Sequence, residues 1–477
     1  MLNLRVHKWL MVVGVTVLLA SCKAPTKVEK TLNSTTPESY IANGDSVNSA
    51  DLSWREFFTD PYLIALIDTA LANNQELNII QQEIQISQNE VMARKGEYLP
   101  FLNLGAGAGV DKTARYTPLG ANEATTDIEP GRAMPDPVPD FAIGAYANWE
   151  IDVWRKLRNA KQSAVNRYLS SVEGKNFMVT NLVADIANSY YELLALDNQL
   201  RIIEQNIEIQ TDALRIVKLQ KKSAQVTELA VRRFEAQVLN TRSLKFAISQ
   251  QIIETENKIN FLLGRFPQAV ERSSERFGDL IPNQVFSGVP SDLLQNRPDL
   301  KQAELDLMAA KLDVKVAKAN FYPRLDISSA IGLRAFNPTF LVKAPESMLY
   351  SLAADMAAPL INRKAIKATY FSANSKQIQA VYNYERTILT AYIEVYNQVS
   401  NIQNLESSYE LKSEQVDALV ESITISNNLF RSARADYMEV LLTQRDALEA
   451  RFELIETRKQ QLNAMVNIYQ ALGGGWN

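Results

Sequence analysis

Residues 182–217 read LVADIANSYYELLALDNQLRIIEQNIEIQTDALRIV. Alternating steps of four and three along this stretch place eleven residues on one stripe, and nine of them are large and apolar. The stripe consists of Leu182, Ile186, Ser189, Leu193, Leu196, Leu200, Ile203, Ile207, Gln210, Leu214 and Val217. A period of 3.5 residues predicts a coiled-coil seam, which is narrower than the buried face of a globular helix. The helix, from about 155 to about 222, would be about 100 Å long, which predicts an elongated molecule.

This helix begins a hairpin that the sequence contains twice. The arm that returns from it spans about 228–263, and a second hairpin has arms at about 363–431 and 437–472. Residues of the first hairpin recur 209 positions later. They are Ala164, Leu196, Ser223, Ala224, Leu239, Arg242, Leu263 and Gly264, which recur as Ala373, Leu405, Ser432, Ala433, Leu448, Arg451, Leu472 and Gly473. Upstream, Asn73, Leu77 and Pro100 recur as Asn296, Leu300 and Pro323, and a longer loop between the two sets explains the different spacing. A fixed spacing indicates an internal duplication.

Between the helices of each half the period changes to two. Apolar residues alternate with small or polar ones over 101–110 and 141–151, and more weakly over 325–333 and 348–356. Such alternation predicts two strands in each half. Long surface loops are predicted at 116–140 and 336–347, and Trp149 and Trp154 suit an aromatic girdle at a membrane interface.

No apolar run of 18 residues follows residue 20, so the sequence predicts no transmembrane helix and leaves spanning to the strands. Four strands cannot close a barrel, and open edges are prohibitively costly in lipid. Several chains must therefore share one barrel, and three would supply twelve strands, although the pattern does not fix that number. The predicted fold class is mixed α/β, mainly a long coiled-coil helical barrel with four strands per chain.

The N-terminus resembles a lipoprotein signal. Arg5 and Lys8 precede a short apolar run that ends in Leu19-Ala20-Ser21-Cys22, which fits the bacterial lipobox. Cys22 is the only cysteine, so it forms no internal disulfide. We predict cleavage before Cys22 and its modification by diacylglycerol and an N-acyl chain such as palmitate. The alternative is an ordinary cleavage site with a cysteine nearby by chance.

The predicted organisation is a signal peptide at 1–21, a lipidated tether at 22–60, a first repeat at 61–264, an equatorial linker at 265–292 and a second repeat at 293–477. The net charge of −4 argues against nucleic acid as a partner. The only histidine, His7, lies in the signal peptide, and no nucleophile, base or metal-ligand constellation occurs. An enzyme, a cofactor and a metal site are therefore not predicted.

Three segments carry a family resemblance: LLQNRPDL at 293–300, Ala303-Glu304, and AKANFYPRL at 317–325. They resemble the outer membrane lipoprotein branch of the TolC family, and the resemblance covers nearly the whole mature chain. It implies a homotrimer with a twelve-stranded outer membrane barrel and a periplasmic helical tunnel. It also implies a passive exit duct that opens when a periplasmic adaptor protein and an inner-membrane resistance-nodulation-division transporter engage it.

The resemblance places the tunnel mouth at the two helical turns. The first has Ala224, Val226 and Thr227 at its tip, and the second has Ala433. The family usually has Gly where Ala224 and Ala433 stand, so either the turn avoids a positive φ or the strain is tolerated.

Asp436 and Glu439 are candidates for a ring of pore-gating acids, or they cap and begin the returning helix. Arg431, Arg434 and Tyr437 are candidates for contacts that hold the mouth shut or bind the adaptor, and simple solvation of the two arginines is the alternative.

Two other functions fit parts of the sequence. One is an outer membrane duct for type I protein secretion, and the lipobox and the Arg297-Pro298-Asp299-Leu300 segment favour efflux over it. The other is a structural coiled-coil lipoprotein of the envelope, which explains the seams but not the strands. The transported substrate does not follow from the sequence, because the inner-membrane transporter selects it in machines of this kind.

Overall fold

The computed structural model describes residues 25–26, 28, 30–33, 35–40, 48–273, 277, 280, 286–359, 363–432 and 434–476. Cys22 with the predicted signal peptide, and Ala433, lie outside the described residues. The chain forms two compact units. Unit 1 comprises residues 1–31, 85–168 and 305–381, and unit 2 comprises residues 32–84, 169–304 and 382–477.

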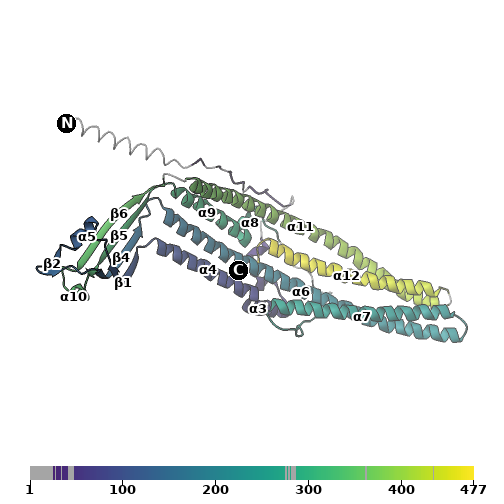
Figure 1. The fold of residues 1–477 in the computed structure, drawn as a ribbon. Helices are drawn as coiled ribbons and strands as arrows, with labels where there is room; N and C mark the ends of the chain where they lie inside the picture. Colours follow the sequence, from purple (N-terminus) through teal and green to yellow (C-terminus); the bar gives the residue numbers. More distant parts are fainter. Residues whose placement is uncertain are drawn as a thin grey trace. The chain divides into compact units, whose positions relative to one another are not determined.

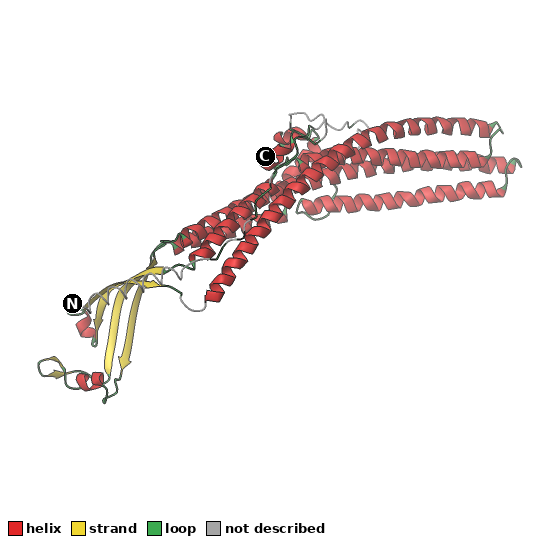
Figure 2. Cartoon of the chain, turned by 90° about the horizontal axis from the view of Figure 1, so that it is seen from above, coloured by secondary structure: helices red, strands yellow, loops and turns green. Residues whose placement is uncertain are grey.

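Unit 1 contains a four-stranded antiparallel sheet in the order β1-β4-β5-β6. Its strands are the long yellow arrows in Figure 2. The strands are β1 (Phe101–Asp111), β4 (Val138–Glu150), β5 (Arg324–Ala335) and β6 (Met348–Ala357). The four predicted strands are therefore confirmed, with small differences at their ends. β1 and β6 each have one side without a partner strand in this sheet.

The register separates the two faces of the sheet. Leu104 pairs with Ala145, Ala145 with Ile331, and Ile331 with Tyr350, so these four side chains lie on one face. Most of that face is apolar and exposed, with Leu104 at 85% and Tyr350 at 82%. The other face carries small residues and charges, including a bidentate pair in which Arg334 donates to Asp140 at 2.8 Å. This division is the one that the alternation predicts.

The predicted loops have more structure than the sequence suggested. The stretch 116–140 contains helix α5 (Pro118–Glu123) and a hairpin of β2 (Asp127–Glu129) and β3 (Arg132–Ala133). The stretch 336–347 contains α10 (Pro338–Leu341). Thr117 and Asn337 cap these short helices, and Pro stands at the first helical position of each. Proline suits the first position of a helix as well as a loop, so these short helices do not stand out in the sequence.

Helices form the remainder. The shorter ones are η1 (Ser49–Asp51), α2 (Trp54–Phe57), α3 (Pro61–Asn73), α4 (Gln75–Glu97), η3 (Pro290–Asp292), α8 (Leu293–Asn296) and α9 (Pro298–Ala319). The hairpins are α6 (Lys156–Lys222) with α7 (Glu228–Leu262), and α11 (Arg363–Arg431) with α12 (Tyr437–Ala471) (Figure 1). Both turns occur where the sequence predicted them, 209 residues apart. No described helix is both long and apolar enough to cross a membrane.

The first long helix begins one residue later than predicted. Arg155 has a φ of 58°, which is left-handed rather than helical. Asp152 accepts hydrogen bonds from the backbone N–H groups of Leu157 at 3.0 Å and Arg158 at 2.9 Å. The carboxylate thus caps the helix from five residues away, an arrangement that no simple capping pattern predicts.

The predicted seam is confirmed in unit 2. Of its eleven positions, only Leu200, Ile207 and Leu214 are half-buried, and the rest are buried. Leu196 and Ile203 of α6 pack with Ile248 of α7, and Phe452 of α12 packs against them. Lys459 of α12 is 13% exposed and pairs with Glu192 of α6 and with Glu456. The seams therefore join the two hairpins as well as the arms of each.

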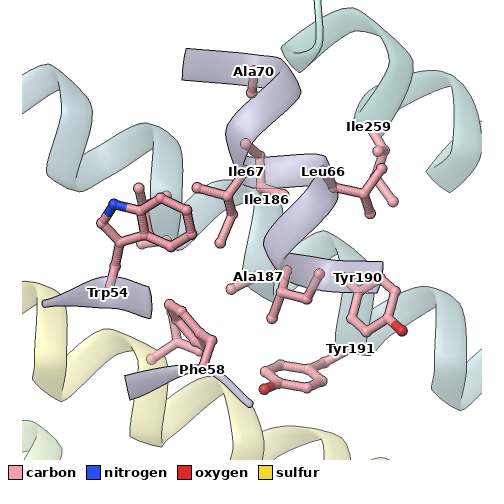
Figure 3. Close-up of a cluster of buried hydrophobic side chains, with 14 of the residues drawn as sticks. Trp54, Phe58, Leu66, Ile67, Ala70, Ile186, Ala187, Tyr190, Tyr191 and Ile259 are labelled. Atoms are coloured by element: carbon pink, nitrogen blue, oxygen red, sulfur yellow. The ribbon is translucent and has the colours of Figure 1, made fainter. Parts of the chain in front are cut away.

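The largest core of unit 2 surrounds α3 (Figure 3). Leu66, Ile67 and Ala70 of α3 pack on Ile186 and Ala187 of α6. Tyr190 closes one end of this core, and its hydroxyl donates to the Asp60 carboxylate at 2.8 Å. Burial, and then this hydrogen bond, raises the pKa of Tyr190 above its usual range.

Gly264 and Gly473 end the returning arms with φ of 67° and 94°. A Cβ on Gly264 would lie 2.5 Å from the Asn73 carbonyl oxygen, and one on Gly473 would lie 2.7 Å from that of Asn296. Both positions thus need glycine for backbone conformation and for close approach to a helix end. The duplication repeats this joint in each half.

Arg297, in the segment that carries the family resemblance, is 5% exposed. It donates to Asp299 at 2.7 and 3.0 Å, to Glu394 at 2.7 Å and to the Ala471 carbonyl at 2.8 Å. The guanidinium thus ties the start of α9 to α11 and to the end of α12. The sequence alone did not predict this role for Arg297.

The part of the predicted tether that belongs to unit 2 lies against α11. The Asn33 backbone N–H donates to Glu385 at 3.0 Å. Tyr40 is buried and stacks on Tyr392, with ring centroids 5.3 Å apart. These contacts attach the segment to the second repeat.

Candidate functional site

The predicted pore mouth consists of the two helical turns, both in unit 2. After α6, the Gln225 N–H donates to the Gln220 carbonyl at 3.0 Å, and the intervening Ala224 has a φ of 56°. This is a Schellman ending, which normally takes glycine. Of the two alternatives for Ala224, the structure therefore shows a positive φ with tolerated strain. The alternative that the turn avoids a positive φ is wrong at this residue. Thr227 then caps α7 by accepting from the Ala230 N–H at 3.4 Å.

The second turn repeats this geometry. The Arg434 N–H donates to the Leu429 carbonyl at 2.9 Å, which is the bond equivalent to that of Gln225. Asp436 is the N-cap of α12 and accepts from the Tyr437 N–H at 2.6 Å. Glu439 lies in the first turn of the same helix. The capping role proposed for Asp436 is thus present, and a carboxylate used in this way still has oxygen lone pairs for other contacts.

Four charged residues of the first tip are paired with one another. Lys221 pairs with Glu228 across the turn, and Arg232 pairs with Glu228 and with Glu235, both at 2.9 Å. The hydrogen bond from Lys221 lowers the pKa of Glu228. The sequence reading missed this chain of ion pairs, although residues 221, 228, 232 and 235 have helical spacing around a short turn.

The charges of the second tip are arranged differently. Arg431, Arg434, Asp436 and Glu439 are all exposed. None of these four forms an ion pair with another described residue, so the structure does not bring the two arginines onto the two acids. Their charges are available to a partner or to the lumen of a tunnel.

Apolar contacts join the two tips. Val217, Val231 and Phe234 of the first hairpin form a buried cluster with Val440 of α12, and Tyr437 packs against it. The Arg233 guanidinium also donates to the Met438 sulfur at 2.7 Å. Tyr437 of the second hairpin therefore contacts a cluster to which both hairpins contribute.

A small cavity of about 200 Å³ lies between the hairpins just behind the tips. Both hairpins line it, and its polar residues are Asp212 of α6, Asn427 and Arg431 of α11, and Gln444 of α12. Gln444 is 2% exposed, and among the described residues neither its amide oxygen nor its amide nitrogen has a hydrogen-bond partner. An unpaired buried amide is costly, so this part of the joint is less stable than an apolar one would be.

A second amide lies in the same seam. The Thr241 hydroxyl donates to the Gln210 oxygen at 2.8 Å, while no residue that the structure describes hydrogen-bonds to the Gln210 amide nitrogen. The sequence showed Gln210 as a polar position in an apolar stripe. Gln444, four residues after Val440 on α12, could have been found in the same way.

No group of three or more His, Cys, Asp and Glu side chains in the described part of the chain could hold a metal ion. The arrangement consists of turns, caps, exposed charges and a polar seam. It can contact a partner or a passing solute.

A sequence profile described as outer membrane efflux protein matches residues 66–265 and 289–474. The chain belongs to this family. Its members are channel proteins of the outer membrane, and the chain is accordingly the outer membrane exit duct of an efflux system.

Relatives match over almost the full length. Pyoverdine export outer membrane protein OpmQ of Pseudomonas aeruginosa is 28% identical over 470 residues, 98% of this chain and 97% of the relative. Cation efflux system protein CusC of Escherichia coli is 24% identical over 440 residues, 91% and 92% of the two chains. The open-state crystal structure of the MtrE outer membrane channel of Neisseria gonorrhoeae has a TM-score of 0.82 at 19% identity, over 95% of this chain and 98% of MtrE, and shows the same fold.

Proposed function

We propose that three copies of this chain close into one passive duct, with twelve strands in the outer membrane and the helical hairpins in the periplasm. The observation that carries the proposal is the sheet, which has two unpaired edges and one apolar, exposed face. Unpaired backbone groups cost several kcal/mol each in lipid. β1 of one copy therefore pairs with β6 of the next until the ring closes.

The hairpins of unit 2 support a ring independently. On α7, Leu239, Phe246 and Ile253 recur every seven residues and are at least half exposed. On α11, Leu411 and Ile425 are similarly exposed. Phe246 lies 18 residues from the start of α7, and Leu411 lies 20 residues from the end of α11, so the two are at similar distances from the tips. Exposed heptad stripes of this kind are stabilised by packing against a partner helix. We propose that the stripe on α7 of one copy packs against the stripe on α11 of a neighbouring copy.

The duct moves solutes without selecting them. The relatives are named for a siderophore, for toluene and for cations, yet each aligns with about nine-tenths or more of this chain. Selection by a separate inner-membrane transporter explains how one architecture serves such different cargoes. A periplasmic adaptor protein would join that transporter to the tips. Arg431, Arg434 and the turn residues Ala224, Val226, Thr227 and Ala433 are the contacts that we assign to the adaptor.

Lipidation of Cys22 would fix the mature chain to the membrane, and the residues that follow it would form the tether. Support comes from the lipobox at 19–22 and from the tether's contacts on α11 through Asn33 and Tyr40. Mass spectrometry of the purified chain tests this, because triacylation at Cys22 adds a defined mass that Cys22→Ser removes. An unmodified N-terminus at a different residue would disprove it.

Three copies of Glu439, with Asp436 beside them, would form an acidic ring at the mouth. Glu439→Gln should reduce the preference for cations in planar bilayers, measured from reversal potentials in a KCl gradient. Glu410→Gln, an exposed acid farther from the tip along the second hairpin, is the control. Unchanged selectivity in the Glu439 variant would remove the ring.

The ring of copies itself is tested by cross-linking. Phe246→Cys and Leu411→Cys, combined in one chain and treated with a short bismaleimide, should give a ladder that ends at the trimer. Either substitution alone should give none. A chain that remains monomeric and conducts no ions would disprove the duct.

A further inference from the structure

The cavity between the two hairpins just behind the tips indicates how neighbouring copies contact each other. It joins the two hairpins of one chain, with Asp212 of α6 and Arg431 of α11 both on its lining. In a ring of copies the hairpins alternate, so each first hairpin also meets the second hairpin of a neighbouring copy. That second kind of joint is not part of a single chain.

Because the two hairpins are duplicates, the residues of the joint between copies can be inferred from those of the joint within a chain. α6 ends at Lys222 and α11 at Arg431, while α7 spans Glu228–Leu262 and α12 spans Tyr437–Ala471. Every one of these boundaries differs by 209, without an insertion. Each cavity-lining residue therefore has a counterpart in the other hairpin, at the same height above the tip.

The counterparts of the charged lining residues keep their signs. Asp212 corresponds to Glu421, and Arg431 corresponds to Lys222. Asn427 corresponds to Lys218, which adds a second positive charge. We infer that neighbouring copies meet at the tips through an ion-pair joint in which Lys218 and Lys222 of one copy face Glu421 of the next. This inference rests on the proposed ring of three copies.

The charges of the single chain fit this assignment. Lys218, Lys222 and Glu421 are exposed, and none of them forms an ion pair with a described residue of its own chain. The neighbouring Lys221 and Arg232, in contrast, are paired with Glu228. The helix dipole accounts for a lysine in the last turn of α6, but its effect fades within that turn and leaves Lys218 unexplained.

A shallow hollow on α6 contains these lysines. Thr211, Leu214, Arg215, Lys218, Leu219 and Lys222 line it, with a volume of about 390 Å³, and no other described helix contributes to it. Leu219 is 53% exposed. Ile425, the counterpart of the cavity residue Ile216, is 51% exposed on α11. An apolar centre with a charged rim is the usual composition of a protein interface.

The two joints differ in a way that matters for opening. Within a chain, Phe234 and Phe430 help to close the joint, and their counterparts are Thr443 and Lys221, neither of which is buried in the single chain. The joint between copies is therefore more polar, and salt screens it more strongly. The hairpins should separate first between copies, while each pair of hairpins stays together.

Cross-linking distinguishes the two joints, and the duplication supplies a matched control. Lys222→Cys with Glu421→Cys, treated with bismaleimide in the full-length, membrane-reconstituted protein, should give chains linked to one another. Asp212→Cys with Arg431→Cys should link within one chain and leave its mass unchanged. A linkage within one chain, or no linkage, for the first pair would overturn the inference.

Charge reversal tests the interaction itself. Glu421→Lys should raise the single-channel conductance of the isolated protein in 0.1 M KCl, because each of the three joints then carries like charges that repel. The triple variant Lys218→Glu, Lys222→Glu, Glu421→Lys should return it to near the unmodified value. Glu410→Lys, an exposed acid two turns or more farther from the tip, should have no effect. Failure of the triple variant to restore conductance would refute the ion-pair joint.

The outcome for the ring remains separable. If Phe246→Cys and Leu411→Cys still give a trimer while the 222–421 pair gives no product between chains, only the ion-pair joint fails. If neither pair links chains, the proposed ring fails with it.

Discussion

Replacing Ala224 by glycine should stabilise the first helical tip. Ala224 has a φ of 56°, and alanine in that left-handed region costs about 1–2 kcal/mol. Glycine removes that cost but adds about 0.4–1 kcal/mol of conformational entropy to the unfolded chain. The expected net gain is about 0.5–1 kcal/mol, which is roughly a two- to five-fold change in a local opening equilibrium.

Hydrogen exchange measures this effect locally. The Gln225 amide bonds to Gln220 across Ala224, so its exchange reports opening of the turn. In the Ala224→Gly variant, peptides that cover residues 219–230 should exchange about two- to five-fold more slowly.

Ala236→Gly supplies the control for this experiment. Ala236 is an exposed residue inside α7, where glycine should cost about 1 kcal/mol and speed exchange. Unchanged or faster exchange at 219–230 in the Ala224 variant, alongside the expected change in the control, would refute the claim that strain is stored in this turn.

Three further predictions concern unit 2. Gln444→Leu should raise the unfolding temperature and stabilise the protein by about 1–2 kcal/mol, because it removes two buried amide atoms without a described partner at similar volume. Gln210→Leu should stabilise the protein less, because it also breaks the bond to Thr241. Equal stabilisation by the two variants would contradict this reasoning. Arg297→Met should destabilise by about 3 kcal/mol in denaturant titrations, since Asp299 loses its partner in a largely buried site, and a change below about 1 kcal/mol would show that the network contributes little. Below pH 10 the folded and unfolded states both keep the Tyr190 proton, so its raised pKa does not affect stability there. Above pH 10 the free energy of unfolding falls, because the unfolded chain loses a proton that the folded chain retains. Tyr190→Phe should make this fall less steep between pH 10 and 12, and an identical pH profile would exclude the contribution.

Periodicity predicted the fold because it reports which side chains share a face. The strand and hairpin arms follow from it, since the alternation at 101–110 and the seam at 182–217 each extend over many residues. Shorter elements such as α5 and the β2–β3 hairpin have too few residues to show a period. Their signals, Thr117 before Pro118 and Gly131 with a φ of 82°, are local and resemble those of an irregular loop.

The sequence predicted where the candidate mouth lies but not the side-chain contacts within it. The 209-residue spacing placed both turns, and the positive φ of Ala224 follows from the Schellman geometry once the helix ends are known. The pairing of Lys221 with Glu228 depends on the path of the turn, and the isolation of Gln444 depends on which helix faces it. Such contacts depend on how separate helices pack against one another, which a periodic pattern within one helix does not predict.

The sheet of unit 1 imposes an order on biogenesis. A lone copy released into water would present two strand edges that can hydrogen-bond with any extended peptide, beside an uncovered surface of leucine, tyrosine and methionine. Such a species is prone to aggregate. Newly exported chains must therefore be shielded by a chaperone, or keep this region unfolded, until other copies and lipid are at hand. A cell that makes the chain faster than it can be inserted should accumulate insoluble material.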